Sequence, residues 1–413
     1  MAEGDDAVTE SLTRILFVDD EPQVLDGLRR MLRPLAAEWE MEFVESGEEA
    51  LTRISAQPFD VIVTDMRMPG MDGVQLLEQV RALHPDAIRI VLSGHSDPQT
   101  ILRSVGSTHQ YLSKPCDPDR LRTMIRRSWS LQNLLGSDRL KQLVGGMDHL
   151  PSMPTLFRDV VRELQGPDAS LKKVGALIAK DPSMTAQILR LVNSSFFGMS
   201  REISSPTAAV AYLGIGTVTS LVLSVKIFQE ANPQLLHDLQ LEGLWDHSFR
   251  TGTLARDIAL EITNDQQMAE DCFTSGMLHD VGKLVLCVNF PGRYRDVLGQ
   301  PSAGLVRMSE AESQAFGADH AEIGAYLMGI WGLPTSIVEA VAFHHAPLRC
   351  FSGEFAPVVA VHVANCLDAE GGANSTSVEP LDEKCVGALG LTRRIARWRE
   401  RVRAVAVDSG TSA

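Results

Sequence analysis

The sequence has no closely spaced pair of cysteines, and this absence excludes two kinds of small stabilised domain. The six cysteines of the 413-residue chain stand far apart, with no Cys-x-x-Cys spacing. A disulfide framework and a zinc finger both depend on such spacing, so we interpret the cysteines as reduced core thiols in a reducing compartment. They are Cys116, Cys272, Cys287, Cys350, Cys366 and Cys385.

Long apolar runs are also missing. The chain has no run of roughly 18 consecutive apolar residues, the length that a transmembrane helix needs. Its first residues, Met-Ala-Glu-Gly-Asp-Asp, are acidic, whereas a secretory signal begins with cationic residues. We therefore expect a soluble cytoplasmic protein without a membrane partner.

Positive charge is scarce relative to negative charge. The chain has 38 Lys and Arg against 53 Asp and Glu, which gives a formal net charge of -15. An acidic surface repels phosphates, so a nucleic-acid partner is not expected. With 44% hydrophobic and 22% charged residues, the composition is that of an ordinary globular protein long enough for two or three domains.

The first third of the chain alternates strand-like and helix-like patterns. After residues 1–13, which we expect to form a disordered acidic lead-in, five β/α units follow one another. This order predicts an α/β doubly wound fold with a parallel five-stranded sheet. The strand-like segments are Ile15–Val18, Met41–Val44, Phe59–Thr64, Ile88–Leu92 and Tyr111–Ser113. The helix-like segments start at Pro22 and continue with Glu48–Ile54, Val74–Leu83, Pro98–Val105 and Pro118–Leu135.

Polar residues follow four of these strands. Asp19 and Asp20 follow the first strand, Asp65 ends the third, Ser93 follows the fourth, and Lys114 follows the fifth. The carboxyl ends of parallel strands meet at one edge of a sheet, so we expect these side chains to share a site. Three crowded carboxylates need a cation, and an all-oxygen, partly hydrated site suits Mg²⁺. The alternative, in which each residue is a helix cap or a surface charge, does not explain why they gather at strand ends.

The same positions carry a family resemblance. Four motifs occur in order and at suitable spacing, and residues 14–128 therefore resemble a response-regulator receiver domain. The motifs are Asp19-Asp20-Glu21, Asp65-x-x-Met-Pro-x-Met-Asp-Gly, Ser93-Gly94 and Lys114-Pro115.

The resemblance implies a phosphoacceptor and a magnesium site. Asp65 would accept a phosphoryl group from a cognate histidine kinase. Mg²⁺ would be bound directly by Asp20 and Asp65, through water by Asp19, and by the backbone carbonyl of Arg67. The metal would neutralise the charge that accumulates during phosphoryl transfer.

The resemblance also implies how the phosphoryl group is held and sensed. Ser93 and Lys114 would contact its oxygens, supplying a hydrogen bond and a positive charge. Ser93 and Tyr111 would form the switch pair that reports phosphorylation. A half-buried structural tyrosine is an equally simple interpretation of Tyr111.

A helical pattern continues beyond the predicted sheet. From residue 118 to about residue 143, apolar residues recur at spacings of three and four, which indicates an amphipathic helix. This linker segment, residues 118–146, overlaps the last helix of the first domain. It either forms a homodimer seam through residues 118–143 or simply leads into the next domain. Gly145-Gly146 interrupts the pattern, so we expect the boundary close by.

The remaining pattern is helical, which predicts an all-α domain over residues 147–370. Asp181-Pro182 and Ser205-Pro206 each read as a helix N-cap followed by proline in the first turn. Several histidines and one aspartate stand where they could bind one or two metal ions and activate water for phosphoester hydrolysis. A hydrogen-bonded polar core is the alternative for His279-Asp280. These candidate ligands are His247, His279, Asp280, His320, His344 and His345.

Five motifs in the first half of this region resemble an HDOD domain, a relative of the HD phosphohydrolases. The resemblance implies an HD-type helical fold and extends to about residue 370. The motifs are Leu150-Pro151-x-Met153-Pro154, Ile178-Ala179-Lys180-Asp181-Pro182, Leu191-Val192-Asn193-Ser194-Ser195-Phe196-Phe197-Gly198, Ile203-Ser204-Ser205-Pro206 and Leu213-Gly214-Ile215.

The resemblance implies a dinuclear metal site with two departures from the hydrolase pattern. The histidines and Asp280 align with ligands for Fe, Mn or another divalent metal, and Lys283 aligns with a lysine that faces the substrate phosphate. Asn365 stands where the pattern has a last aspartate, and its amide lacks the negative charge. The Gly-Tyr-Pro motif, which is the signature of one class of cyclic-dinucleotide phosphodiesterase, does not follow His345.

Residues 371–413 are expected to form a loop and a basic amphipathic C-terminal helix near residues 392–405. Its arginines could meet an acidic partner or nucleic acid. A helix that packs its apolar side on the domain and leaves the arginines in water is the favoured interpretation. The arginines are Arg393, Arg394, Arg397, Arg399, Arg401 and Arg403.

These expectations combine into one hypothesis and one alternative. The hypothesis is a bacterial two-component response regulator: phosphorylation of Asp65 is passed through the linker helix to an HDOD output domain that acts mainly by binding an unknown downstream protein. The alternative is a receiver-regulated, metal-dependent phosphohydrolase with a nucleotide or cyclic-dinucleotide substrate. A DNA-binding regulator is disfavoured because no helix-turn-helix pattern follows the first domain.

Overall fold

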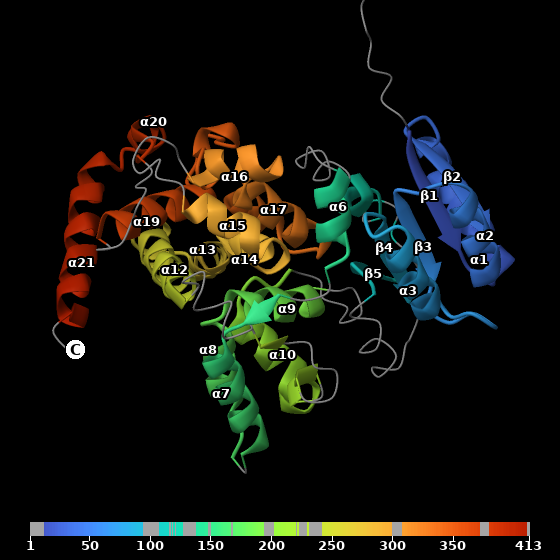
Figure 1. Ribbon diagram of the computed structural model, residues 1–413, viewed down its shortest axis with the longest axis horizontal. Coiled ribbons are helices and arrows are strands. Elements are labelled where there is room, and N and C mark those ends of the chain that lie inside the picture. Colours follow the sequence, from blue (N-terminus) through green and yellow to red (C-terminus); the bar gives the residue numbers. More distant parts are fainter. Residues whose placement is uncertain are drawn as a thin grey trace, which may run out of the picture. The chain divides into compact units, whose positions relative to one another are not determined.

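The structure is a computed structural model of the chain that divides into two compact units, Met1–Trp129 and Ser130–Ala413 (Figure 1). Each unit is described by itself. The described residues are 12–93, 107–114, 117, 119, 121–126, 138–147, 150–166, 168–193, 202–219, 221–222, 229–230, 242–299, 308–371 and 380–410.

The first unit is built on a five-stranded sheet with the order β2-β1-β3-β4-β5, in which every neighbouring pair is parallel. The sequence prediction of a parallel five-stranded sheet is confirmed. The strands are β1 (Thr13–Val18), β2 (Trp39–Val44), β3 (Val61–Asp65), β4 (Ile88–Ser93) and β5 (Gln110–Ser113).

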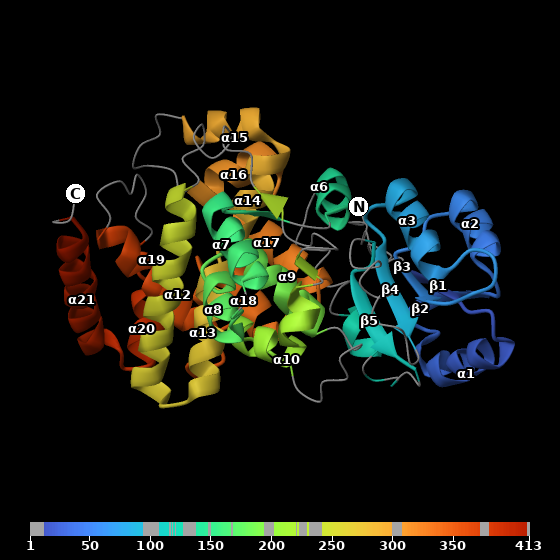
Figure 2. The same ribbon diagram turned by 90° about the horizontal axis from the view of Figure 1, so that it is seen from below.

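Helices cover both faces of this sheet, as a doubly wound fold requires. Figure 2 shows α2 and α3 on one side of the strands and α1 on the other. On the α1 side, alternate strand residues such as Phe17 and Val63 pack with Leu28 of α1 and with Ile125. The helical elements are α1 (Pro22–Leu32), η1 (Arg33–Leu35), α2 (Gly47–Ala56) and α3 (Gly73–Leu83).

Two predicted helices fall partly or wholly outside the described residues. The segment Pro98–Val105 is one of them. Of the predicted linker helix, residues 121–126 are helical in the first unit, and α6 (Asp138–Gly145) is a helix in the second unit. Residues 127–137 lie between them outside the described part, so a continuous helix and a dimer seam stay predictions.

The second unit is mostly helical, which confirms the predicted fold class. A short parallel pair, β6 (Pro151–Ser152) with β7 (Gln229–Glu230), departs from a purely helical architecture. Its first helices are α7 (Pro154–Gln165), α8 (Leu171–Ile178), α9 (Pro182–Val192) and α10 (Pro206–Thr219). They are followed by α12 (Glu242–Thr263), α13 (Gln266–Leu278), α14 (Val281–Asn289), α15 (Pro291–Leu298), α16 (Met308–Phe316) and α17 (His320–Ile330). The last are α18 (Thr335–Phe343), η4 (Pro347–Arg349), α19 (Pro357–Gly371), α20 (Glu383–Ala388) and α21 (Thr392–Gly410).

The predicted N-cap Asp181 joins three elements of this unit. Its side chain is fully buried and accepts hydrogen bonds from the backbone N–H of Met184 (3.0 Å) and of Met153 (2.7 Å). It also accepts one from the indole N–H of Trp245 (3.2 Å). The cap therefore fixes the start of α9 against α12 and the entry to α7.

The C-terminal helix α21 packs its apolar side on the domain. Ile395 and Trp398 are buried in the same core cluster as residues of α12 and α19. Arg394, Arg397 and Arg401 form ion pairs with Glu261. This arrangement is the packed one that the sequence favoured. None of the described helices has the length and apolar character needed to cross a membrane.

Glycines allow the helices around the histidines to approach one another closely. A Cβ at Gly276 of α13 would lie 2.6 Å from the Cα of Gly252 in α12. A Cβ at Gly282 of α14 would lie 1.9 Å from the carbonyl oxygen of His320 at the start of α17. Because backbone and not a flexible side chain blocks these positions, both crossings require glycine.

We expect Gly282→Ala to lower the free energy of unfolding of the second unit by about 1–3 kcal/mol, the cost of overpacking a close contact. Gly292→Ala is the matched control, because Gly292 is also the second residue of its helix and nothing lies within 4 Å of its Cβ position. The control should be neutral or slightly stabilising. Denaturant unfolding measures both, and equal stability of the two variants would contradict the proposed contact.

Candidate functional site

The polar residues at the strand ends of the first unit do come together. The Lys114 ammonium, just after β5, contacts Asp19 Oδ2 at 2.6 Å and also contacts Asp65 Oδ1. Asp19 follows β1 and Asp65 ends β3, so three strands supply one cluster. Asp20 is half-buried next to Asp19.

Backbone groups hold the second oxygen of each carboxylate. Asp65 Oδ2 accepts a hydrogen bond from the backbone N–H of Arg67 (2.8 Å), and Asp19 Oδ1 accepts one from Glu21 (3.1 Å). The loop folds tightly over Asp65, because a Cβ at Gly73 would lie 2.0 Å from the Asp65 carbonyl oxygen. The loop sequence that identified this site thus has a steric reason for its glycine.

Burial and the contacts between Lys114 and the two carboxylates together shift the pKa values in this cluster. Burial raises the pKa of Asp19 above its ordinary value, although hydrogen bonds from Lys114 and the Glu21 backbone oppose the shift. For Lys114, burial lowers the pKa, but the hydrogen bonds and charges of Asp19 and Asp65 outweigh it, so the pKa is raised. The ammonium therefore remains a cation that balances the carboxylates.

The donor set fits Mg²⁺. Asp19, Asp20 and Asp65 offer carboxylate oxygens at one sheet edge, and the site already gathers a positive charge between two of them. A hard divalent cation prefers such oxygen ligands. Arg67 lies against Asp65 through its N–H, and the role of its carbonyl stays a prediction.

The predicted switch pair is placed only in part. Tyr111 is buried on β5, with 5% of its surface exposed. Ser93 ends β4 and is paired with Ser113 in the sheet, but its side chain lies outside the described part. The switch role of both residues stays a prediction.

Replacing Lys114 by Met should destabilise the first unit most at neutral pH. Asp19 would lose its cation while staying buried, at a cost of about 1–3 kcal/mol. The pKa of Asp19 is already raised by burial, and without Lys114 it rises further. The native state then binds a proton more readily than the unfolded chain, so stability falls as pH rises through that pKa and is regained on acidification.

Chemical unfolding of Lys114→Met between pH 4 and pH 8 measures this effect. Arg53→Met is the control, because Arg53 is half-exposed and makes only long ion pairs to Glu42 (3.7 Å) and Glu49 (3.5 Å). The control should change stability by less than about 0.5 kcal/mol. A stability deficit of Lys114→Met that does not shrink at acid pH would contradict the account.

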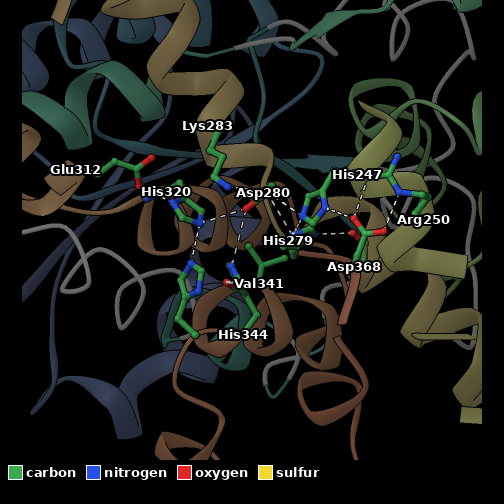
Figure 3. Close-up of polar contacts among 12 residues, drawn as sticks. His247, Arg250, His279, Asp280, Lys283, Glu312, His320, Val341, His344 and Asp368 are labelled. Carbon is green, nitrogen blue, oxygen red and sulfur yellow. Dashed lines mark hydrogen bonds and ion pairs between the residues drawn. The ribbon is translucent and has the colours of Figure 1, made fainter. Parts of the chain in front are cut away.

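Six of the predicted metal ligands of the second unit come together, with five histidines around Asp280 (Figure 3). They form two groups in which the donor atoms lie within 4.8 Å of one another. Most of them stand where helices begin or end, at the junctions that the close glycine contacts bring together. The first group is His247, His279 and Asp280, and the second is His320, His344 and His345.

Each carboxylate oxygen of Asp280 faces one group. Oδ2 lies 3.5 Å from His279 Nε2 and 3.7 Å from His247 Nε2. Oδ1 lies 3.2 Å from His320 Nε2 and 4.0 Å from His344 Nε2. Asp280 therefore stands between the groups, as a carboxylate that bridges two ions would.

Four of the five histidines are oriented by a hydrogen bond at Nδ1. The acceptors are backbone carbonyls or carboxylates, which assigns the proton to Nδ1 and leaves Nε2 directed at the centre. This is the outer-shell pattern that orients metal-binding histidines. The contacts are His247 to Asp368 (2.7 Å), His279 to Gly276 (2.7 Å), His320 to Glu312 (2.5 Å) and His344 to Val341 (2.9 Å).

One buried atom indicates that the centre of the site fits a bound metal ion. Within the described residues, His344 Nε2 is buried and has no hydrogen-bond partner. Such an atom is costly to bury unless something binds it. A divalent metal ion fits an imidazole nitrogen beside a carboxylate.

Burial sets the charge states of the group. It lowers the pKa of His279 to about 4 and the pKa of His344 and His345 well below the ordinary value. For Asp280, burial opposes the charged form, but the neighbouring His279 and Lys283 outweigh it and hold the pKa well below its ordinary range. Neutral imidazoles around an ionised carboxylate are the forms that bind metals.

His320 differs from the other histidines. Burial lowers its pKa, but the charge of Glu312 and the hydrogen bonds to Asp280 and Glu312 outweigh that effect and raise it to about 10. His320 and Glu312 thus form a buried ion pair. A metal ion at Nε2 would displace the proton from that nitrogen.

An acidic residue that the sequence reasoning missed, Asp368 of α19, reaches the site, and the role of Asn365 as a ligand stays a prediction. Asp368 accepts from His247 and, in a two-pronged contact, from the Arg250 guanidinium at 2.7 and 3.0 Å. Asn365 is half-buried one turn earlier. Residues three apart lie on the same face of a helix, so Asp368 could have been proposed as an alternative to Asn365 from the sequence.

Lys283 lies at the more open side of the site. Its ammonium contacts Asp280 Oδ2 at 2.7 Å, and 24% of its side chain is exposed. His247 and His345 are also half-buried, whereas His279 and His344 are fully buried. Lys283, His247 and His345 are therefore the side chains of the site that reach solvent.

The comparisons with known families match both units. Residues 15–126 match the response regulator receiver domain family, and residues 150–347 match the HDOD domain family.

Curated relatives match parts of the chain. An uncharacterized protein of Treponema pallidum is 28% identical over 202 residues, covering 48% of this chain and 38% of the relative. The hydrogenase transcriptional regulatory protein HoxA of Cupriavidus necator is 37% identical over 131 residues, covering 31% of this chain and 27% of the relative. The chain thus spans well under half the length of these relatives.

Solved structures similar to parts of this chain include the MmoQ response regulator of Methylococcus capsulatus and a receiver domain of an HD domain-containing protein from Pseudomonas fluorescens. The first is 24% identical, covers 61% of this chain and 98% of that chain, and has a TM-score of 0.46. The second is 28% identical, covers 30% of this chain and 98% of that chain, and has a TM-score of 0.29.

Proposed function

Because this chain belongs to the response regulators that join a receiver domain to an HDOD domain, we propose that Asp65 is its phosphoacceptor and that the HDOD domain is the output controlled by it. The donor would be a histidine kinase in the cytoplasm. The observation that supports the proposal is the contact of Lys114 with both Asp19 and Asp65 at the strand ends.

In this proposal each residue of the receiver site has a part in phosphoryl transfer. The Arg67 N–H and the Lys114 ammonium hold the two oxygens of Asp65, one of which would attack the incoming phosphorus atom. Lys114 then balances the charge that spreads over the phosphoryl oxygens. Mg²⁺ held by Asp19, Asp20 and Asp65 supplies further charge neutralisation when bound. Ser93 is proposed to donate a hydrogen bond to the same oxygens.

Asp65→Asn should abolish phosphorylation of the protein by acetyl phosphate and Mg²⁺. The wild-type protein should gain a hydroxylamine-labile adduct, detected as a mass increase and mapped to residue 65. Asp72→Asn is the control, because Asp72 lies in the same loop, caps α3, and Asn is an equally good N-cap. An adduct that persists in Asp65→Asn, or none in the wild type, would remove the basis of the proposal.

We propose that the signal reaches the HDOD domain through α6. This helix packs against α17, and Met147 just after it contacts Asn289 of α14 at 3.9 Å. His320 begins α17 and Asp280 precedes α14. A shift of α6 would thus act on two helices that carry the histidine site, or on the surface that binds a downstream protein.

A second function is favoured by the arrangement around Asp280. Its two oxygens face two histidine groups whose rings are oriented from behind, which is more than a protein-binding surface requires. We propose that the HDOD domain is a metal-dependent phosphohydrolase of the HD type, with a nucleotide or cyclic-dinucleotide substrate. Fe, Mn or another divalent metal would supply an activated water when bound.

The remaining residues of the site have roles in this second function. His247, His279 and Asp280 would hold one ion, and His320, His344 and His345 with Asp280 would hold the other. Lys283 would hold a phosphate oxygen at the exposed edge. Asp368 would orient His247, while Arg250 keeps Asp368 in place.

Purified protein should contain close to two divalent metal ions per chain, and Asp280→Ala should lose both because both groups share that carboxylate. Asp296→Ala on the exposed side of α15 is the control and should keep them. Inductively coupled plasma mass spectrometry measures the metal after expression in Mn²⁺- and Fe²⁺-supplemented medium. A folded wild-type protein that stays metal-free would leave protein interaction as the only output.

A further inference from the structure

Glu312 of α16 is a fully buried carboxylate directly behind one of the proposed metal ligands (Figure 3). Its Oε2 accepts hydrogen bonds from both the ring Nδ1 (2.5 Å) and the backbone N–H (2.9 Å) of His320. A carboxylate buried to 0% exposure is rare unless it is paired and hydrogen-bonded. It lies outside the motifs that identified the domain.

A second element holds Glu312 in this position. The Tyr294 hydroxyl of α15 donates a hydrogen bond to Glu312 Oε1 at 3.0 Å, and Tyr294 is itself 3% exposed. Three buried residues thus form a chain from Tyr294 through Glu312 to His320, and His320 Nε2 ends it 3.2 Å from Asp280 Oδ1. Both carboxylate oxygens of Glu312 therefore accept hydrogen bonds from these two neighbours.

The two histidine groups differ in the charge that surrounds them. The first group contacts Asp368, but Arg250 contacts the same carboxylate and balances it. The second group consists of three imidazoles and shares Asp280 with the first. Once a metal ion has displaced the His320 proton, these imidazoles bring no charge of their own. A buried divalent ion held only by neutral ligands and half of one carboxylate would be poorly stabilised, because burial removes its hydration.

We propose that Glu312 is the positioning residue that lets the His320, His344 and His345 group hold a metal ion. It provides the missing negative charge through the Nδ1–H of His320, which makes Nε2 a stronger donor and fixes the ring. Tyr294 keeps Glu312 in place without changing its charge. The inference rests on the proposed metal centre and predicts that the two ions depend on different buried residues.

Glu312→Gln tests the charge with little change in shape. The amide oxygen can still accept from both His320 groups, and the amide N–H can donate to the Tyr294 oxygen, so only the negative charge is lost. Tyr294→Phe is the matched control, because it removes one hydrogen bond to Glu312 and keeps the charge. The probe is Mn²⁺, added to metal-stripped full-length protein in a buffer with excess Mg²⁺, which fills the oxygen site of the receiver while the imidazole ligands favour Mn²⁺.

The expected result is a stepwise loss confined to one ion. Wild type and Tyr294→Phe should bind two Mn²⁺ and show the electron paramagnetic resonance spectrum of a spin-coupled pair. Glu312→Gln should bind the second ion about 10–100-fold more weakly and show the spectrum of an isolated ion at limiting Mn²⁺. Circular dichroism confirms the fold of each variant.

Two outcomes would overturn the inference while the metal centre stands. One is two Mn²⁺ of unchanged affinity in Glu312→Gln, and the other is an equal loss in Tyr294→Phe, which would assign the effect to packing. Should Glu312→Gln unfold, Glu312→Asp keeps the charge on a shorter side chain and must retain the second ion. A wild-type protein that binds no Mn²⁺ overturns the proposed metal centre together with the inference.

Discussion

The second unit depends on balancing the buried charge of Asp280. An ionised carboxylate that is 1% exposed is tolerated only where cations or hydrogen-bond donors surround it. Lys283 supplies one such cation at 2.7 Å, and the histidines supply polar nitrogens on the other sides. Most of these groups stand at the ends of α13, α14, α17 and α18. The charge of Asp280 is therefore balanced only when these helix ends pack together.

The same constraint organises the receiver on a smaller scale. Asp19 is as deeply buried as Asp280, and it is balanced by an ammonium from another strand end. In the receiver the balancing ammonium comes from a distant strand end, whereas Asp280 is balanced by Lys283, three residues away, and by histidines that come mostly from other helices. Both arrangements are complete only in the folded chain. The difference lies in the ligand chemistry: oxygen ligands alone suit Mg²⁺, whereas imidazole nitrogens suit transition metals.

Sequence patterns predicted the receiver site more fully than the histidine site, and the reason is geometric. In a parallel sheet the carboxyl end of every strand lies at one edge, so Asp19, Asp65 and Lys114 could be brought together from strand order alone. No such rule states which helix ends meet. Asp368 was missed because it acts on His247, which lies 121 residues away, and Glu312 was missed because no motif marks it, although it stands only eight residues before His320.

Close packing also decides what a movement of α6 can change. Gly282 lies against the His320 backbone, and a Cβ at Gly324 of α17 would lie 3.0 Å from the Val281 side chain and 3.2 Å from the Gly282 nitrogen, so two glycines let α14 and α17 meet closely. Helices packed this tightly move as one body more readily than they slide past each other. Of these two helices, α17 packs against α6, while α14 is contacted by Met147 just after α6. Under the proposed route, a displacement of α6 would therefore act on Asp280 and His320 together, and the distance most open to change would be the one to His247 on α12.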